Sequence, residues 1–163
     1  MVRRIPAVAV ALLSAAAVSV GCAEVAAAAT APTAPAPAPA ACTSAQIIKI
    51  TQLAFHPPAV APGQIATAVL SAVNCTNQTQ QTSATWSGRF LGASTGIPAG
   101  CPAIDPLALP MNFAPHAQLT GSVGYLVPAS CTATDLQVTV LIYKQGVLLA
   151  QRSADLPIIQ PTP

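Results

Sequence analysis

Four of the five cysteines, Cys42, Cys75, Cys101 and Cys131, follow the first quarter of the chain and carry the clearest chemical signal in it. Cysteine thiols either pair as disulfides or bind metal, and zinc sites favour closely spaced cysteine and histidine pairs. The sequence has no Cys-x-x-Cys motif. We therefore predict two disulfides and no metal site. Disulfides persist in oxidising compartments, so the same residues predict an exported protein.

A second group of residues matches a hydrolase motif. Gly92-Ala93-Ser94-Thr95-Gly96 has the G-x-S-x-G pattern, in which a strand-to-helix turn exposes a nucleophilic serine. Its partners would have to be Asp105 and His116. No helical period follows the motif, and the domain is too small for an α/β-hydrolase. We interpret the segment as a flexible Gly/Ser loop and predict no catalytic residues.

Histidines and charged residues are few. His56 and His116 both neighbour prolines, and we expect them to be loop residues and not metal ligands. After residue 41 the cations are Lys49, Arg89, Lys144 and Arg152, and the anions are Asp105, Asp135 and Asp155. Nucleic-acid binding needs clustered basic residues that neutralise phosphates, so four scattered cations argue against it. We expect neither a cofactor nor a nucleic-acid partner.

The N-terminus has the pattern of a targeting signal. Arg3 and Arg4 precede an apolar run from Ile5 to Val20, and small residues follow. This order predicts a cleaved secretory signal peptide over residues 1–29. A retained membrane anchor is the alternative, but a span needs about 20 apolar residues and Glu24 interrupts the run. Cys22 follows a sequence loosely like a bacterial lipobox, so lipidation of Cys22 and a lipid anchor stay open.

Residues 30–41 alternate proline with alanine and threonine. Proline lacks a backbone N–H and disfavours helix in the residue before it, so such a stretch forms an extended, semi-rigid spacer. The alternative is a disordered N-terminus of the mature chain. Either way, we place the folded domain at residues 42–161.

The sequence pattern of that domain predicts strands, because short β-branched runs alternate with proline, glycine and asparagine. We expect strands over Ile47–Phe55, Ile65–Val73, Thr79–Leu91, Met111–Ala114, Leu119–Val127 and Leu136–Lys144, and a last one from Val147 towards Leu156. A turn is expected at Ala61-Pro62-Gly63-Gln64 and a long loop over 92–110. About seven short strands in this length predict an all-β, immunoglobulin-like β-sandwich, with Trp86 packed between its two sheets.

Four cysteines allow three pairings. In a sandwich whose successive strands alternate in direction, Cys42 precedes the first strand and Cys75 follows the second, at the same end. Cys101 and Cys131 both fall in loops at the opposite end. This geometry favours Cys42–Cys75 and Cys101–Cys131, and each disulfide would contribute roughly 3–4 kcal/mol.

The stretch from Val60-Ala61-Pro62-Gly63-Gln64 to Val73-Asn74, followed by Trp86, resembles bacterial adhesion-type immunoglobulin-like modules. The hairpin from Val138 to Ala150 is similar to their last two strands, and the whole chain resembles small secreted actinobacterial proteins. The resemblance covers about 110 residues and implies an extracellular binding module. The four cysteines and the proline-rich 97–110 segment depart from those modules, so no binding residue is transferred.

Two sets of residues are candidate binding surfaces. Six aromatic residues could form a sugar-stacking platform: Phe55, Trp86, Phe90, Phe113, Tyr125 and Tyr143. The long loop, with the apolar residues Ile97, Ile104, Leu107 and Leu109, is the better candidate, because function concentrates on loops held by a rigid scaffold. Two formal glycosylation sequons begin at Asn74 and Asn77, and we expect only a polar turn there.

These observations predict an exported, disulfide-stabilised and non-enzymatic module that is secreted or surface-anchored and binds a protein or organises the envelope. The alternative is a carbohydrate- or cell-wall-binding module whose partner is a surface glycan. We expect no membrane span after signal cleavage.

Overall fold

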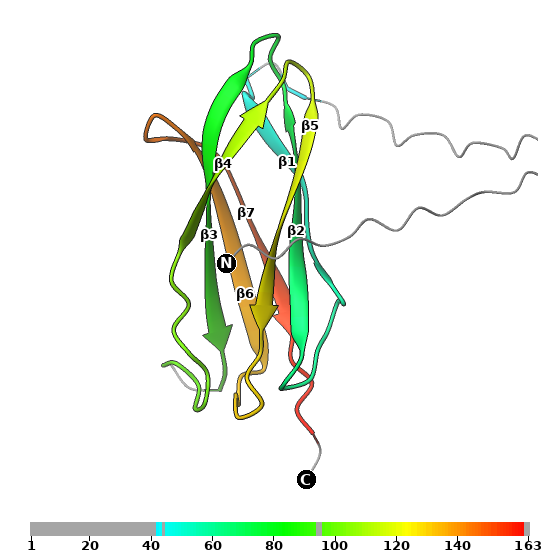
Figure 1. Cartoon of the computed structure of the whole chain (residues 1–163), viewed down its shortest axis with the longest axis vertical. Helices are drawn as coiled ribbons and strands as arrows, with labels where there is room; N and C mark the ends of the chain where they lie inside the picture. Colours follow the sequence, from blue (N-terminus) through cyan, green and yellow to red (C-terminus); the bar gives the residue numbers. More distant parts are fainter. Residues whose placement is uncertain (1–41, 44, 94–95, 162–163) are drawn as a thin grey trace, which may run out of the picture. The chain divides into compact units, whose positions relative to one another are not determined.

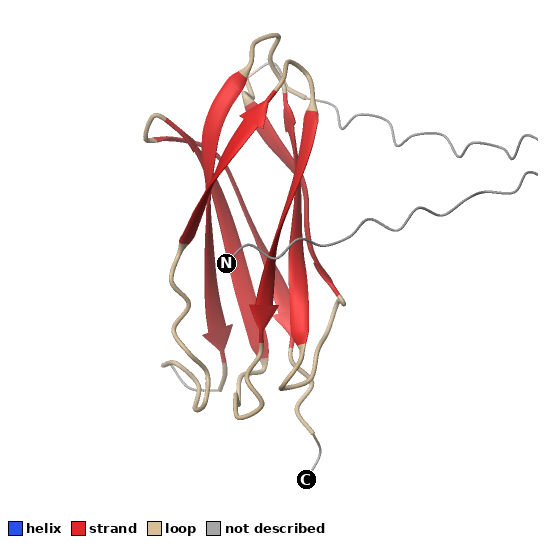
Figure 2. Cartoon of the chain, viewed as in Figure 1, coloured by secondary structure: helices blue, strands red, loops and turns tan. Residues whose placement is uncertain are grey.

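The computed structural model describes residues 42–43, 45–93 and 96–161. The expected signal peptide, the spacer, Cys22 and Ser94 lie outside the described residues. Seven antiparallel strands form two sheets, and no helix occurs in the described part (Figures 1 and 2). Nor do these residues include any helix that could cross a bilayer.

One sheet has the order β1-β2-β5, and the other has the order β4-β3-β6-β7. The strand bounds are β1 Ile48–His56, β2 Ile65–Asn74, β3 Gln80–Leu91, β4 Leu107–Phe113, β5 Gln118–Leu126, β6 Asp135–Lys144 and β7 Val147–Pro157. The seven strands expected from the sequence are therefore confirmed, with most bounds within two residues.

The fourth strand is the main departure from expectation. It begins at Leu107 and not at Met111, so the long loop spans residues 92–106 and not 92–110. Prolines in this segment suggested a loop, but β4 is an edge strand and pairs with β3 alone. A strand at an edge tolerates proline because one row of its N–H groups needs no partner, which explains Pro110 inside β4.

The core lies between the sheets and follows the two-residue alternation of the strands. Ala66, Ala68, Leu70 and Ala72 of β2 face it, as do alternate residues of β6 from Leu136 to Ile142. Trp86 in β3 is 2% exposed and has the core position expected for it. The side of the sandwich between β1 and β7 is closed by Arg152, whose guanidinium donates to the carbonyl of Thr51 at 3.2 Å, in the bulge of β1.

One disulfide lies at each end of the sandwich. Cys42 pairs with Cys75 beside the start of β1 and the end of β2, and Cys101 pairs with Cys131 in the loops after β3 and β5. We call these the Cys42 end and the Cys101 end. The structure therefore has the pairing that strand alternation favours.

Candidate functional site

The loop of residues 92–106 at the Cys101 end is held firmly to the neighbouring loop of residues 127–134. Besides the Cys101–Cys131 disulfide, the carbonyl of Ala99 accepts hydrogen bonds from the N–H of Thr132 at 3.0 Å and from its hydroxyl at 3.2 Å. The N–H of Thr134 donates to the carbonyl of Leu91 at 2.9 Å. The loop is therefore a fixed part of the surface at these points.

Gly100 is the closest point between the two loops. Its φ of 71° lies in the left-handed region, and a Cβ at this position would overlap the backbone carbonyl of Ser130. Only glycine fits such a backbone approach without strain.

Gly100→Ala is therefore expected to lower the free energy of unfolding by about 1–3 kcal/mol, because the two loops must separate to admit the methyl group. Urea denaturation of the purified chain measures this. Gly96→Ala in the same loop is the matched control, because a Cβ at Gly96 meets nothing within 4 Å. Equal effects of the two substitutions would contradict the close approach.

The later part of the loop fills the side of the sandwich where β3 extends beyond β4. Ile104 packs over Gly88, and a Cβ at Gly88 would lie 2.9 Å from Ile104 Cδ1 and 3.1 Å from Tyr125 Cε1. The absence of a side chain at Gly88 therefore lets Ile104 and Tyr125 meet against the β3 backbone.

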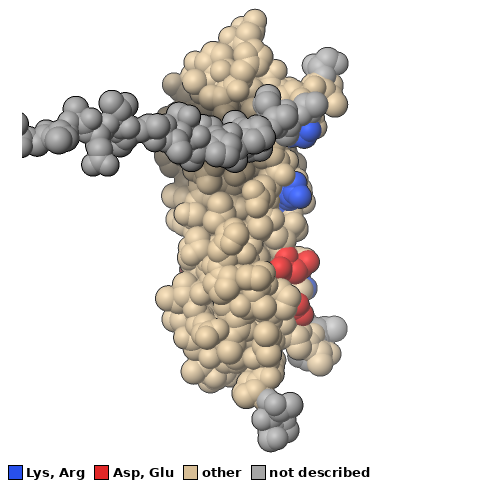
Figure 3. All heavy atoms as spheres, turned by 90° about the vertical axis from the view of Figure 1, so that its right-hand side faces the viewer, with Lys and Arg blue, Asp and Glu red and all other residues tan. Residues whose placement is uncertain are grey.

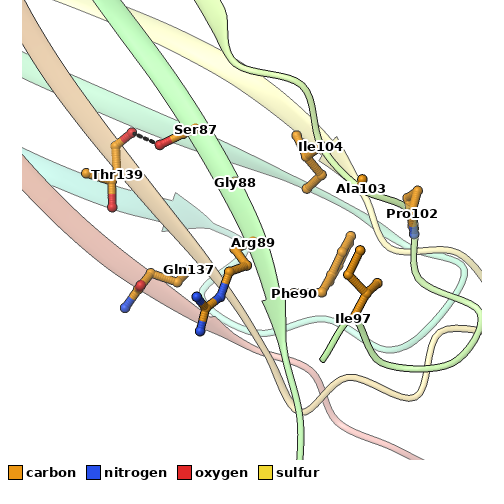
Figure 4. A pocket seen from close by; sticks show the side chains of 10 residues that line it. All are labelled: Ser87, Gly88, Arg89, Phe90, Ile97, Pro102, Ala103, Ile104, Gln137 and Thr139. Carbon is orange, nitrogen blue, oxygen red and sulfur yellow. Dashed lines mark hydrogen bonds between the residues drawn. The ribbon is translucent and has the colours of Figure 1, made fainter. Parts of the chain in front are cut away.

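Two pockets flank this part of the loop. The first, of about 450 Å³, combines Ser87, Arg89, Gln137 and Thr139 on the outer face of β3 and β6 with apolar loop residues. Figure 4 shows the polar group on one side of β3 and Ile97, Pro102 and Ile104 on the other, with Gly88 between them. The Ser87 hydroxyl donates to the carbonyl of Thr139 at 3.3 Å.

The second pocket, of about 270 Å³, opens between the loop and β5. Its walls are mostly apolar: Trp86, Phe90, Pro102, Ile104, Leu107 and the β5 residues from Val123 to Leu126. Asp105 is its one charged lining residue. We call it the β5 pocket. Phe90 of β3 and the loop residues Pro102 and Ile104 line both pockets, so the two pockets share a wall.

Tyr125 is a buried lining residue of the β5 pocket. The residue is 6% exposed, and its ring packs edge-on against Phe55 at a centroid distance of 6.4 Å. Its hydroxyl makes no hydrogen bond with any described residue. Burial disfavours the charged phenolate and raises the pKa of Tyr125 to about 12.

This pKa predicts a loss of stability at high pH. The unfolded tyrosine ionises near pH 10, whereas the folded one stays neutral to about pH 12. The free energy of unfolding should be unaffected by this group below pH 10 and should fall as the pH rises from 10 to 12. Urea denaturation across this range should show the fall in the native chain and a smaller one in Tyr125→Phe. Tyr143→Phe is the control and should retain the full fall; identical curves for all three proteins would refute the assignment.

The residues that could form a hydrolytic triad are not brought together. Asp105 lies two residues before β4, and His116 follows its other end, in the turn before β5. Seven residues of strand span about 23 Å, so the two side chains are at opposite ends of the sandwich. Ser94 lies outside the described residues.

The two histidines are also far apart. His56 ends β1 at the Cys101 end, whereas His116 is at the Cys42 end, and both are exposed as expected for loop and strand-end residues. In the described ranges, no three histidine, cysteine or acidic residues are grouped closely enough to hold a metal.

Five of the six aromatic residues are buried, and Tyr143 is half-buried. The five buried rings belong to the core, so the six residues do not form the exposed row that a sugar-stacking platform needs. Charged side chains are sparse on the face in Figure 3, which shows only a few blue and red side chains along one border. No basic cluster is visible on that face.

The sequence alone does not show the structural role of Asn74, a polar residue at the Cys42 end. Asn74 is fully buried, and its amide nitrogen donates to the carbonyls of Gln78 at 2.7 Å and Ala114 at 3.0 Å. Its oxygen accepts from the N–H of Thr76 at 3.0 Å and from the Thr76 hydroxyl at 2.8 Å. Both the nitrogen and the oxygen of the side-chain amide are thus hydrogen-bonded, and they link the turn after β2 to the turn after β4. Asn74 is the last residue of β2 and not part of the turn that follows it.

No model of a known protein family matches the sequence, and no curated protein matches it. One similar solved structure is the Pseudomonas fluorescens alkylpurine DNA glycosylase AlkC bound to DNA containing an abasic site analog. The two chains share 15% sequence identity at a TM-score of 0.49, over 69% of this chain and 31% of that chain. This chain therefore spans less than a third of that protein, and the likeness carries no conclusion about activity.

Proposed function

We propose that this chain is an exported, non-enzymatic immunoglobulin-like module that binds another protein at the cell envelope through its Cys101 end. The observation that carries the proposal is that exposed apolar side chains are more numerous at this end than at the Cys42 end, where Ile47, Val147 and Leu148 are exposed. Ile65 and Ile97 are each 63% exposed and Leu126 is 57% exposed. Ile65 and Leu126 are direct partners across β2 and β5. Exposed apolar patches on a soluble domain are typical of interaction sites.

The position of this surface supports the proposal. The chain enters the domain at Cys42, and Leu126 and Ile97 lie at the other end of the strands. The proposed surface therefore does not include the residues at which the chain enters the domain. The disulfides support folding in an oxidising compartment, as the predicted signal peptide requires.

The strand order supports an immunoglobulin-like relationship. In immunoglobulin constant domains, strands A, B, E and D face strands C, F and G. In this comparison β1, β2 and β5 would correspond to A, B and E, and β3, β6 and β7 would correspond to C, F and G. The difference is β4, which pairs with β3 and not with β5.

Site-specific photocrosslinking in cells that export the chain tests the protein-binding function. A photoreactive residue at Ile97 should give one discrete protein adduct, because Ile97 is exposed on the proposed surface. The control position is Gln81, which is exposed near the Cys42 end of β3, and it should give none. Equal labelling at both positions, or retention on insoluble cell-wall glycan with no protein adduct, would contradict the proposal.

A further inference from the structure

The edges of the two sheets differ in how they are protected against strand pairing. Natural sheets protect edges with charges, prolines and bulges. Among the described edge strands, β1 has a bulge between Ile50 and Gln52, β4 contains Pro110, and β7 carries Arg152 and Asp155. Each of these three edges has at least one such device.

The edge formed by β5 has none of them. Its sequence from Gln118 to Leu126 contains no charged residue and no proline, and its register with β2 is unbroken over nine pairs. The strand pairs with β2 on one side only. An unprotected edge of this length presents a row of backbone N–H and C=O groups to which an extended chain can add.

The β5 pocket lies directly beside this edge, because residues from Val123 to Leu126 belong to both. Its volume of about 270 Å³ can admit one large apolar side chain, since a cavity of about 150 Å³ already holds a benzene ring. Leu107 and Leu126 are exposed at its rim. Tyr125 also lines the pocket and is buried there.

The charge of the residues that line the β5 pocket indicates which residues the partner should carry. Asp105 is exposed and is the one charged residue that lines the pocket, whereas none of the four described cations does. A second copy paired through β5 would bring no cation from that strand, because β5 contains none. A basic residue close to the inserted apolar side chain would complement Asp105.

We infer that an extended segment of another protein adds as a strand to the free edge of β5, inserts one apolar side chain into the β5 pocket and places a lysine or arginine near Asp105. In such recognition, backbone hydrogen bonds give affinity and side-chain pockets give specificity. This inference rests on the proposed protein-binding function and names the class of partner and the mode of binding.

Direct binding of synthetic peptides to the purified chain tests the inference. The probes are capped peptides of about eight residues, a common strand length, with alternating valine and threonine, one central leucine and a lysine two positions later. Replacing the leucine by alanine should weaken binding about tenfold or more, as expected for an apolar pocket. Replacing the lysine by glutamate should weaken it as well, most strongly at low salt.

Two variants of the protein test the same contacts from the protein side, by their effect on peptide binding. Asp105→Lys should reverse the preference from the lysine peptide to the glutamate peptide, and Ser122→Lys should weaken both by charging the exposed edge. Amide NMR signals of residues 118–126 should shift on binding. Signal changes confined to residues outside β5, an unchanged preference in Asp105→Lys, or self-association through β5 that excludes the peptides would each overturn the inference.

The same variants distinguish a failure of strand addition at β5 from a failure of the proposed protein-binding function. If the Ile97 adduct in cells persists in Ser122→Lys and Asp105→Lys, the module binds a protein but not by strand addition. If no adduct forms even with the native edge, the protein-binding function itself fails.

Discussion

Replacing Asn74 by alanine is expected to lower the free energy of unfolding by about 3–4 kcal/mol. The substitution removes all four hydrogen bonds of a fully buried amide. The carbonyl of Gln78 keeps the Thr76 hydroxyl as a donor, and the carbonyl of Ala114 keeps the N–H of Ala117. Each lost hydrogen bond costs about 0.5–1.5 kcal/mol, so the loss of four together exceeds that of a typical point mutation. Urea denaturation of the purified chain measures the change.

Asn77→Ala is the matched control, because Asn77 is exposed and also begins a sequon. It should change stability by no more than about 0.5 kcal/mol. Asn74→Asp should resemble the alanine variant, since a carboxylate accepts but cannot donate to the two carbonyls. A small effect of both Asn74 variants would show that the two turns are held together by other contacts.

Removing the Cys101–Cys131 disulfide by the double substitution Cys101→Ala and Cys131→Ala should lower the free energy of unfolding by about 3.5 kcal/mol. The two cysteines are 30 residues apart, and closing a loop of that length restricts the unfolded chain by this amount in the entropic account. The same change should abolish the Ile97 adduct in cells, because the loop of residues 92–106 loses its covalent tie.

The double substitution Cys42→Ala and Cys75→Ala is the control for the loss of the Cys101–Cys131 disulfide. Its cysteines are 33 residues apart, so the loss of stability should be nearly equal. The Ile97 adduct should nevertheless persist, because this disulfide lies at the other end of the sandwich. Loss of the adduct in both variants would mean that stability alone, and not the shape of the loop, controls binding.

The strands and disulfides could be predicted because they depend on local patterns and on strand alternation. The run from Leu136 to Lys144 alternates buried and half-buried residues as its sequence suggests. The start of β4 could not be predicted in this way. Pro106 and Pro110 suggest a loop unless it is known that this strand lies at an edge, and that depends on the pairing of the whole sheet.

The candidate site was predictable only in outline. The composition of the proline-rich loop predicts a candidate surface, but the packing of Ile104 over Gly88 depends on the three-dimensional register of β3. The sequence suggests Tyr125 as a sugar-stacking residue, whereas its position on β5 makes it part of the core and of a pocket. The sequence indicates only a turn at Asn74, because its partner Ala114 is 40 residues away in the sequence.

Peptide mapping under non-reducing conditions tests the central claim most directly: a sandwich of two β-sheets with one disulfide at each end, which we propose folds outside the cytoplasm. The chain would be recovered from the envelope or medium of a bacterium that expresses the complete sequence. We predict linked peptides containing Cys42 with Cys75 and Cys101 with Cys131. Free thiols at these four positions, or any other pairing among them, would contradict the account.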